Sequence, residues 1–363
     1  MDTRKTLANI LALAALATAG VTNPDLSVIG QVLGGWTDDP ASTDKNRATL
    51  HLGEVELVAD APLNPYAKGV VVLTASETGA SVEEAYASLD DLLPLGLAIK
   101  AGKYRAPFGK INPTHPHALP FVDPPRLLRP ETGLIPGNES WNETALQLSE
   151  LFPGAGSWAP QVSVDVEEGK GWRDGQNSDS AASDWDPRHD ETHLAWLGHF
   201  SNGFSWDDWL AGDAGLSLGT GTVNVAAGTR ATVAGADLKL KFFLDGRTRL
   251  LLQGEWLRRW SQDASWSVAK DNYLKTDVDR QGSYGFFDLA RDRWDGGVLY
   301  EAYDARTGGI DQAVKAFAGF GLMEETTLFR LTFEHFTPHT GPSVNTVGGQ
   351  LLFSMGPHKP HAF

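Results

Sequence analysis

Hydrophobic and polar residues alternate with a period of two along much of this chain. The clearest example runs from Ala234 to Phe242, where Asp237, Lys239 and Lys241 separate apolar side chains. Shorter stretches repeat the pattern at 95–101, 146–149, 194–200, 250–256 and 329–334. Such alternation predicts β-strands with one apolar and one polar face.

Sixteen segments of this kind can be found, and many are about ten residues long, enough for a tilted strand to cross a bilayer. We expect them near 26–36, 48–60, 65–75, 81–91, 95–105, 140–152, 158–167, 190–201, 205–218, 228–243, 247–260, 282–291, 294–304, 312–323, 326–337 and 344–355. Short turns are expected at 61–64, 92–94, 202–204, 244–246 and 324–325, and longer polar loops most clearly at 168–189 and 261–281. Short turns on one side and long loops on the other are typical of bacterial outer-membrane barrels.

The predicted fold is therefore all-β: a transmembrane antiparallel β-barrel of sixteen strands. A soluble β-sandwich or jelly roll would share the alternation and the turn residues. The long strands, the asymmetry of the loops and the charged residues in mid-strand favour the barrel, because such residues suit a wet lumen. No run of about 18 apolar residues follows Ala19, which excludes a helical membrane protein.

One stretch, from Leu95 to Glu139, breaks the alternating pattern. It begins as a strand and continues through about thirty residues (110–138) that contain seven prolines and no regular period. A structureless loop of this length is unusual in a compact domain. A wide barrel has an enclosed space that such a loop can fill, so we predict that residues 106–139 form the third external loop and fold into the lumen.

Charged and histidine side chains gather in and beside this predicted loop. Opposed fixed charges in a pore set its ion preference, and the same charges can tie a loop to the wall by salt bridges. We expect both roles. The predicted constriction residues are Lys100, Arg105, Lys110, His115, His117, Asp123, Arg126, Arg129 and Glu131.

Composition narrows the class of protein further. The 363 residues carry a formal net charge of −16, which argues against a nucleic-acid partner, and no cysteine, which excludes disulfides and thiolate sites.

Residues 1–19 have the basic start, apolar run and small-residue end of a signal peptide. We therefore expect a single barrel domain at 20–363, ending in a short tail at 356–363.

A family resemblance rests on two neighbouring motifs. Glu84-Ala85-Tyr86, followed after a turn by Gly102–Gly109 (GKYRAPFG), resembles the phosphate-selective porin superfamily. The longer run GKYRAPFGKINPTHPHALPFVDPPRLL resembles a branch of uncharacterised porin-like proteins, some labelled zinc-regulated outer-membrane receptors. The likeness covers about residues 80–135 and implies a trimeric passive channel. The mixed charges of the inward faces depart from the lysine and arginine ladder of phosphate-binding members.

His115, His117 and Asp123 form the sharpest candidate metal site. Two imidazoles and a carboxylate suit zinc, but the sequence shows neither a fourth ligand nor the hydrogen-bond partners that would hold them. Packing or hydrogen bonding is the ordinary role of such a pair in a proline-rich loop. His358 and His361 in the tail form a weaker pair.

The sequence thus predicts an outer-membrane porin of a Gram-negative bacterium for small hydrophilic solutes or ions. Its expected partners are outer-membrane lipid, lipopolysaccharide and two further copies of the chain, with no cofactor. A zinc-binding or zinc-uptake protein that uses the His-Pro-His loop is the alternative. A barrel enzyme such as a lipase is more remote, because the sequence contains no nucleophile elbow or phosphate-binding loop, and Gly219-Thr220-Gly221 is interpreted as a plain turn.

Overall fold

The computed structural model describes residues 24–90, 96–137, 140–154, 156–174, 188, 191–322 and 326–356. Several predicted features lie outside the described residues. They are the signal peptide (1–19), the turns at 92–94 and 324–325, residues 138–139 of the predicted loop, most of the loop at 168–189, and the tail after Gly356 with His358 and His361.

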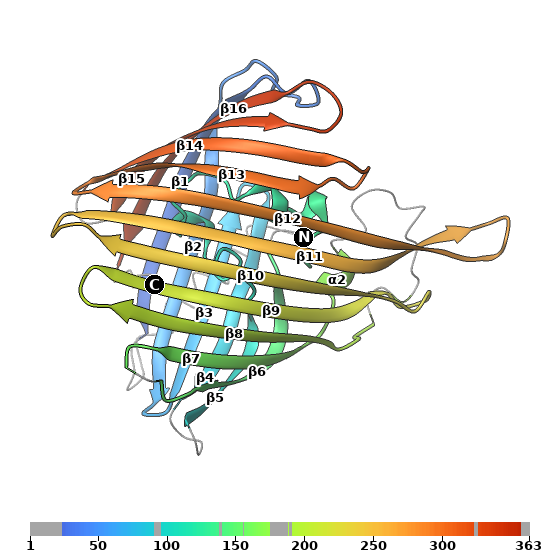
Figure 1. The fold of residues 1–363 in the computed structure, drawn as a ribbon, viewed down its shortest axis with the longest axis horizontal. Helices are drawn as coiled ribbons and strands as arrows, with labels where there is room; N and C mark the ends of the chain where they lie inside the picture. Colours follow the sequence, from blue (N-terminus) through green and yellow to red (C-terminus); the bar gives the residue numbers. More distant parts are fainter. Residues whose placement is uncertain are drawn as a thin grey trace.

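Sixteen antiparallel strands form a closed barrel, as predicted (Figure 1). Each strand pairs with its neighbours in the sequence, and β1 pairs with β16 to close the sheet. The strands are β1 (Asp25–Thr37), β2 (Thr49–Asn64), β3 (Ala67–Ser76), β4 (Gly79–Leu89), β5 (Leu97–Arg105), β6 (Asn142–Leu151), β7 (Ala159–Glu167), β8 (Ala195–Trp206), β9 (Leu210–Asn224), β10 (Thr229–Phe243), β11 (Thr248–Ser267), β12 (Asn272–Arg291), β13 (Trp294–Asp304), β14 (Ile310–Leu322), β15 (Thr327–Thr337) and β16 (Val344–Met355).

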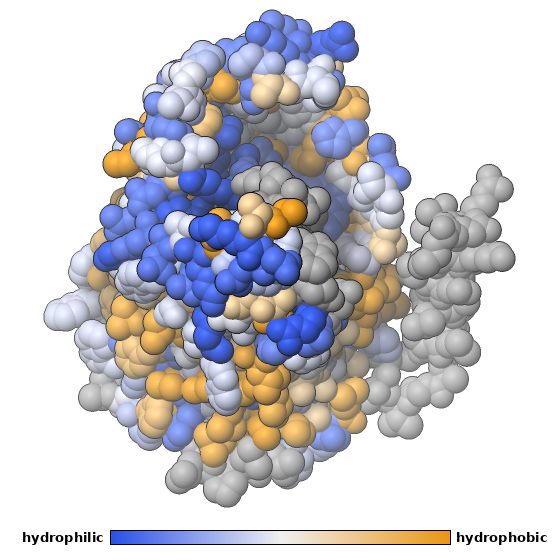
Figure 2. Space-filling view, turned by 90° about the vertical axis from the view of Figure 1, so that its right-hand side faces the viewer, coloured by the Kyte–Doolittle hydropathy of each residue, from blue (hydrophilic) through white to orange (hydrophobic). Residues whose placement is uncertain are grey.

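Alternation along each strand separates an apolar outer face from a mostly polar inner face. On β10, Leu238 is 44% exposed whereas its neighbour Asp237 is 6% exposed. The same period exposes large apolar side chains on other strands, for example Leu148, Val164, Leu218, Leu252, Phe287 and Leu331. Seen from the end where the β11–β12 hairpin projects, hydrophilic residues gather over the middle and hydrophobic ones along the lower flank (Figure 2). Among the described residues, no helix has the length and apolar character needed to cross a membrane.

The β11–β12 hairpin corrects one prediction. The polar stretch 261–281 is not a loop, because both strands are 20 residues long and remain paired out to Ser267 opposite Asn272. Polar pairs such as Gln262 with Asp277 hold this part of the ladder together. The hairpin projects beyond the barrel wall, where strand pairing does not require an apolar face (Figure 1).

Three predicted turns are also wrong. Residues 202–204 belong to β8, and the chain turns instead at Asp207, whose φ of 47° is a left-handed conformation that aspartate tolerates. Residues 61–64 belong to the end of β2. Gly219-Thr220-Gly221 lies within β9 and is not a turn.

In its described residues, the long segment between β5 and β6 contains three short 3-10 turns: η3 (Pro116–Ala118), η4 (Arg126–Leu128) and η5 (Pro130–Thr132). Proline is the first residue of two of them, and its ring fixes the backbone φ angle there. A fourth short element, α2 (Gly171–Asp174), follows β7. The apolar core of the molecule consists of this segment, Trp172 and inner-wall residues of β8 to β14.

Candidate functional site

The segment 106–137 is the structural feature around which the candidate site is built. Asn112 closes its base: the side-chain amide donates to the carbonyl oxygens of Ala106 and Trp141, at 2.8 and 3.0 Å, and accepts from the Trp141 amide. The Ala106 amide also donates to the Trp141 carbonyl. One buried asparagine thus holds the two ends of the long segment together.

Phe108 of the segment, together with Trp141 and Trp172 beyond it, packs against the wall at glycine positions. A Cβ on Gly235 would lie 2.8 Å from the Phe108 ring, and a Cβ on Gly219 would lie 2.5 Å from Trp141. Trp172 occupies the corresponding space at Gly221, at 2.4 Å. Glycine in a strand often marks such a close approach. The aromatic groups therefore pack directly against the backbone of β9 and β10.

Two buried carboxylates of the wall bind backbone amides of the segment. Glu255 on β11 accepts hydrogen bonds from the amides of Lys110 and Ile111, at 2.7 and 2.8 Å. Glu301 on β13 accepts from Arg126 and Leu127 at the start of η4, both at 3.0 Å. Buried amides must find partners, and charged acceptors form the stronger bonds.

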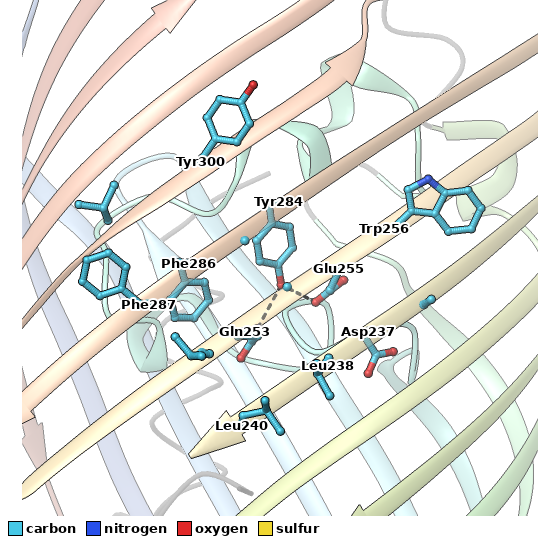
Figure 3. A pocket seen from close by; sticks show the side chains of 15 residues that line it. Asp237, Leu238, Leu240, Gln253, Glu255, Trp256, Tyr284, Phe286, Phe287 and Tyr300 are labelled. Atoms are coloured by element: carbon cyan, nitrogen blue, oxygen red, sulfur yellow. Dashed lines mark hydrogen bonds between the residues drawn. The ribbon is translucent and has the colours of Figure 1, made fainter. Parts of the chain in front are cut away.

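Figure 3 shows how the wall holds Glu255. The Tyr284 hydroxyl donates to Glu255 at 2.6 Å, and the Gln253 amide donates to the Tyr284 hydroxyl at 3.1 Å. These residues line a groove of about 750 Å³. Its other side chains, such as Leu238 and Trp256, lie at exposed positions of the same strands.

Salt bridges fasten the start of the segment to the wall. Arg105 pairs with Glu83 on β4, and Lys110 pairs with Asp213 on β9 and with Asp237 on β10. Burial alone would lower the pKa of Lys110. The two aspartates have the larger effect, so the pKa of Lys110 is raised above its ordinary value. These bonds extend the contacts of the segment to β4, β9 and β10.

The opposite end of the segment, Asp123–Arg129, contacts β14 and β15. Arg126 pairs with Glu334, which also binds Lys315 at 3.1 Å. Lys315 donates to the carbonyl oxygens of Asp123 and Pro124. These side chains and Arg129 line a polar cavity of about 190 Å³. Although burial lowers the pKa of Arg129, Asp123 and other nearby carboxylates raise it above its ordinary value.

His115 and His117 lie against β2 and β4. His117 Nδ1 is 2.9 Å from Glu56 Oε1 on β2. His115 Nδ1 is 3.3 Å from Glu56 Oε2, and its Nε2 is 3.2 Å from Glu84 on β4. Burial would lower the pKa of His115, but the close approach of the Glu56 and Glu84 carboxylates raises it to about 10.

The structure does not group Asp123 with the histidines as a third metal ligand. Within the described ranges, the residue whose ligand atoms lie within 4.8 Å of both histidines is Glu56, and Asp123 lies in the separate cavity with Lys315. Sequence spacing could not reveal this partner, because Glu56 is 59 positions before His115. The available signal was that Glu56 occupies an inward position in the alternating pattern of β2.

The remaining predicted constriction residues divide between wall and segment. Lys100 belongs to β5, and its ammonium lies 4.1 Å from the ring centre of Tyr86 and 4.0 Å from that of Tyr104. Glu131 lies in η5 and is exposed. Sequence reasoning missed Asn112, Glu255 and Glu301, which hold the segment through its backbone.

The fold belongs to the class of porin-type barrels, as comparison with solved structures shows. The anion-selective porin of Comamonas acidovorans matches with a TM-score of 0.60 and 10% identity, over 92% of this chain and 100% of that one. The outer-membrane channel DcaP of Acinetobacter baumannii matches at 0.58 and 10%, over 93% and 98%. The trimer form of Vibrio cholerae OmpT matches at 0.54 and 10%, over 93% and 100%. At this identity the likeness concerns the fold.

Sequence comparison is less informative. No protein-family model matches the chain. An uncharacterised protein of Aquifex aeolicus strain VF5 is 28% identical over 226 residues, which are 58% of this chain and 45% of that relative. The match therefore spans less than half of the relative's length.

Proposed function

We propose that this chain is an outer-membrane porin of a Gram-negative bacterium that lets small hydrophilic solutes or ions diffuse passively. In this proposal residues 106–139 lie inside the lumen and narrow it, and residues 1–19 direct export. Two of the solved structures that share the fold carry the names of an outer-membrane channel and of an anion-selective porin.

One observation carries the proposal: the segment bonds to strands around most of the barrel. Its partners include Glu56 on β2, Asp213 on β9, Glu255 on β11 and Glu334 on β15. A segment can reach opposite walls of a closed cylinder only from within. Charged groups of both signs then border the remaining passage, where they set ion preference.

Planar-bilayer recording with the purified protein tests this proposal. We expect discrete conductance steps, and their absence at every voltage would exclude a porin. A variant in which residues 113–136 are replaced by a short glycine-serine linker should conduct more than the native chain. Equal conductance in the two proteins would reject the constriction while leaving the channel activity in place.

Membership of the phosphate-selective porin superfamily is part of the same proposal. A Cβ on Gly102 would lie 2.2 Å from the Ala85 carbonyl oxygen, so the glycine of one motif packs against the strand of the other. The Tyr86 and Tyr104 rings also meet edge to face at 6.0 Å. This contact gives a physical reason for the two motifs to occur together.

We further propose that the protein works as a homotrimer in outer-membrane lipid and lipopolysaccharide. The trimer form of the Vibrio protein supports this assembly by its shared fold alone. Mass measurement in detergent, with the detergent contribution subtracted, should return three copies of the chain. Zinc uptake is not proposed, because none of the compared proteins carries a name that supports it.

A further inference from the structure

The contact between the His-Pro-His turn and the wall contains an unusual group of buried polar atoms. Three of them are Glu56 Oε2, Glu83 Oε2 and His115 Nδ1, and each is buried without a hydrogen bond in the described part of the chain. Buried polar atoms are nearly always hydrogen-bonded, and those without a bond call for an explanation. All three lie around one point.

The spacing of these atoms matches the ligands of a small metal ion. His115 Nδ1 lies 3.3 Å from Glu56 Oε2 and 3.7 Å from Glu83 Oε2. Glu56 and Glu83 offer oxygens within 4.8 Å of each other. In a tetrahedral site with metal–ligand distances near 2.0–2.2 Å, neighbouring ligand atoms are about 3.3–3.6 Å apart.

The other atoms of the same side chains are already engaged, which leaves the three inward atoms available. Glu56 Oε1 bonds to His117, and Glu83 Oε1 bonds to Arg105. His115 Nε2 lies 3.2 Å from Glu84 Oε1. A histidine that ligates a metal through one nitrogen characteristically donates its other N–H to a carboxylate, which fixes the ring.

Local structure holds His115 in this position. It immediately precedes η3, where Pro116 is the first residue, and its extended backbone carries φ of −65°. Arg330 on β15 donates to the His117 carbonyl at 2.7 Å. The ligand atoms therefore come from β2 and β4, which flank β3, and from a braced turn.

We propose that Glu56, Glu83 and His115 bind one divalent transition-metal ion that joins the 106–137 segment to β2 and β4. His117 and Glu84 act as positioning residues, and water completes the coordination. One imidazole and two carboxylates suit zinc and the neighbouring transition metals. Calcium and magnesium instead prefer sites made of oxygen ligands alone. The ion is a structural cross-link, independent of the proposed channel activity and of any uptake of metal.

Calorimetric titration of the folded, chelator-washed protein with Zn²⁺ alone tests the site. We expect one ion per chain, no binding heat in His115→Ala or Glu56→Gln, and binding about tenfold weaker in Glu84→Gln. His339→Ala is the matched control, because His339 forms a separate pair with Asp311 and should leave binding intact. Heat-modifiable mobility on gels verifies that each variant is folded.

Cobalt provides a readout that needs no variant. Co²⁺ bound to the native barrel should show the intense visible absorption of a four-coordinate ion, and excess Zn²⁺ should remove it. Zn²⁺ should also raise the unfolding temperature of the native protein and not that of His115→Ala. Binding that persists in His115→Ala would assign the metal to other residues, and no binding at all would leave protonated His115, without a metal, between Glu56 and Glu83. Either result overturns the proposal.

Discussion

At the scale of single residues, glycines in β9 decide how closely the interior packs. Gly219 and Gly221 face Trp141 and Trp172, and the indole rings occupy the space that a Cβ would need. Sequence analysis interpreted these glycines as a turn because glycine is frequent in turns. Their actual role depends on indoles that are distant in the sequence, so no local pattern could reveal it.

Replacing Gly221 by alanine should destabilise the barrel by about 1–3 kcal/mol, because a Cβ would overlap the Trp172 ring in a tightly packed site. Urea unfolding in lipid vesicles measures the change. Gly246→Ala is the control, since nothing lies within 4 Å of a Cβ there. Equal stability of the two variants would show that the ring moves aside at little cost.

The turn between β10 and β11 is predicted to respond to acid through Asp245. Hydrogen bonds from the Arg247 amide and the Thr248 hydroxyl lower the pKa of Asp245 below its ordinary value of 3.8. A lowered pKa in the folded state means that the contribution to stability is complete above the ordinary value. It is lost as the pH falls through the folded-state value.

Asp245→Ala should therefore be less stable than the native chain at pH 7, and the difference should shrink below about pH 4. Urea midpoints at several pH values measure this change. A difference between the two proteins that stays constant down to pH 2 would show that the carboxylate charge has no part in it.

At the scale of elements, the 106–137 segment is held mainly through its backbone. Proline content and the absence of a period correctly predicted a long irregular segment, and its charged residues were expected to form salt bridges with the wall. Arg105, Lys110 and Arg126 do so. The carboxylates that bind its amides were missed, because Glu255 and Glu301 look like any other inward residues of a strand.

Glu301→Ala should loosen η4, because the Arg126 and Leu127 amides would lose their buried acceptor. The cost is about 1–3 kcal/mol for each amide left unpaired. Trypsin should then cut after Arg126 faster than in the native chain. Glu77→Ala, in an exposed turn, serves as the control, and equal cleavage in both variants would mean that other bonds suffice to hold η4.

At the scale of the whole molecule, the strand count and the antiparallel order could be predicted, whereas several boundaries could not. Where one face of a strand is apolar, apolar and polar residues alternate over a length that spans a bilayer, and this pattern marks the strand. The hairpin at 261–281 lacks that apolar face, so its pairing could not be recognised from hydrophobicity. Closure itself required only that consecutive strands pair and that the first meets the last.

Because β1 lies beside β16, the chain should tolerate a circular permutation. Joining residue 355 to residue 25 through a short linker, with new ends at Gly246, preserves every strand pair. We expect a folded, heat-modifiable barrel. New ends at Phe121, in the buried segment, should instead reduce stability, and equal stability of the two permutants would contradict the importance of that segment.

The pairing of Gly34 with Gly349 also has a consequence for biogenesis. The two glycines are 315 positions apart, so the ribosome must synthesise the chain from β1 as far as β16 before this contact can exist. Until then both margins of the nascent sheet carry unpaired amides and carbonyls, which can pair with other chains. Contacts between such distant residues also form slowly. The unfinished protein therefore needs chaperones that keep neighbouring copies apart until the last strand arrives.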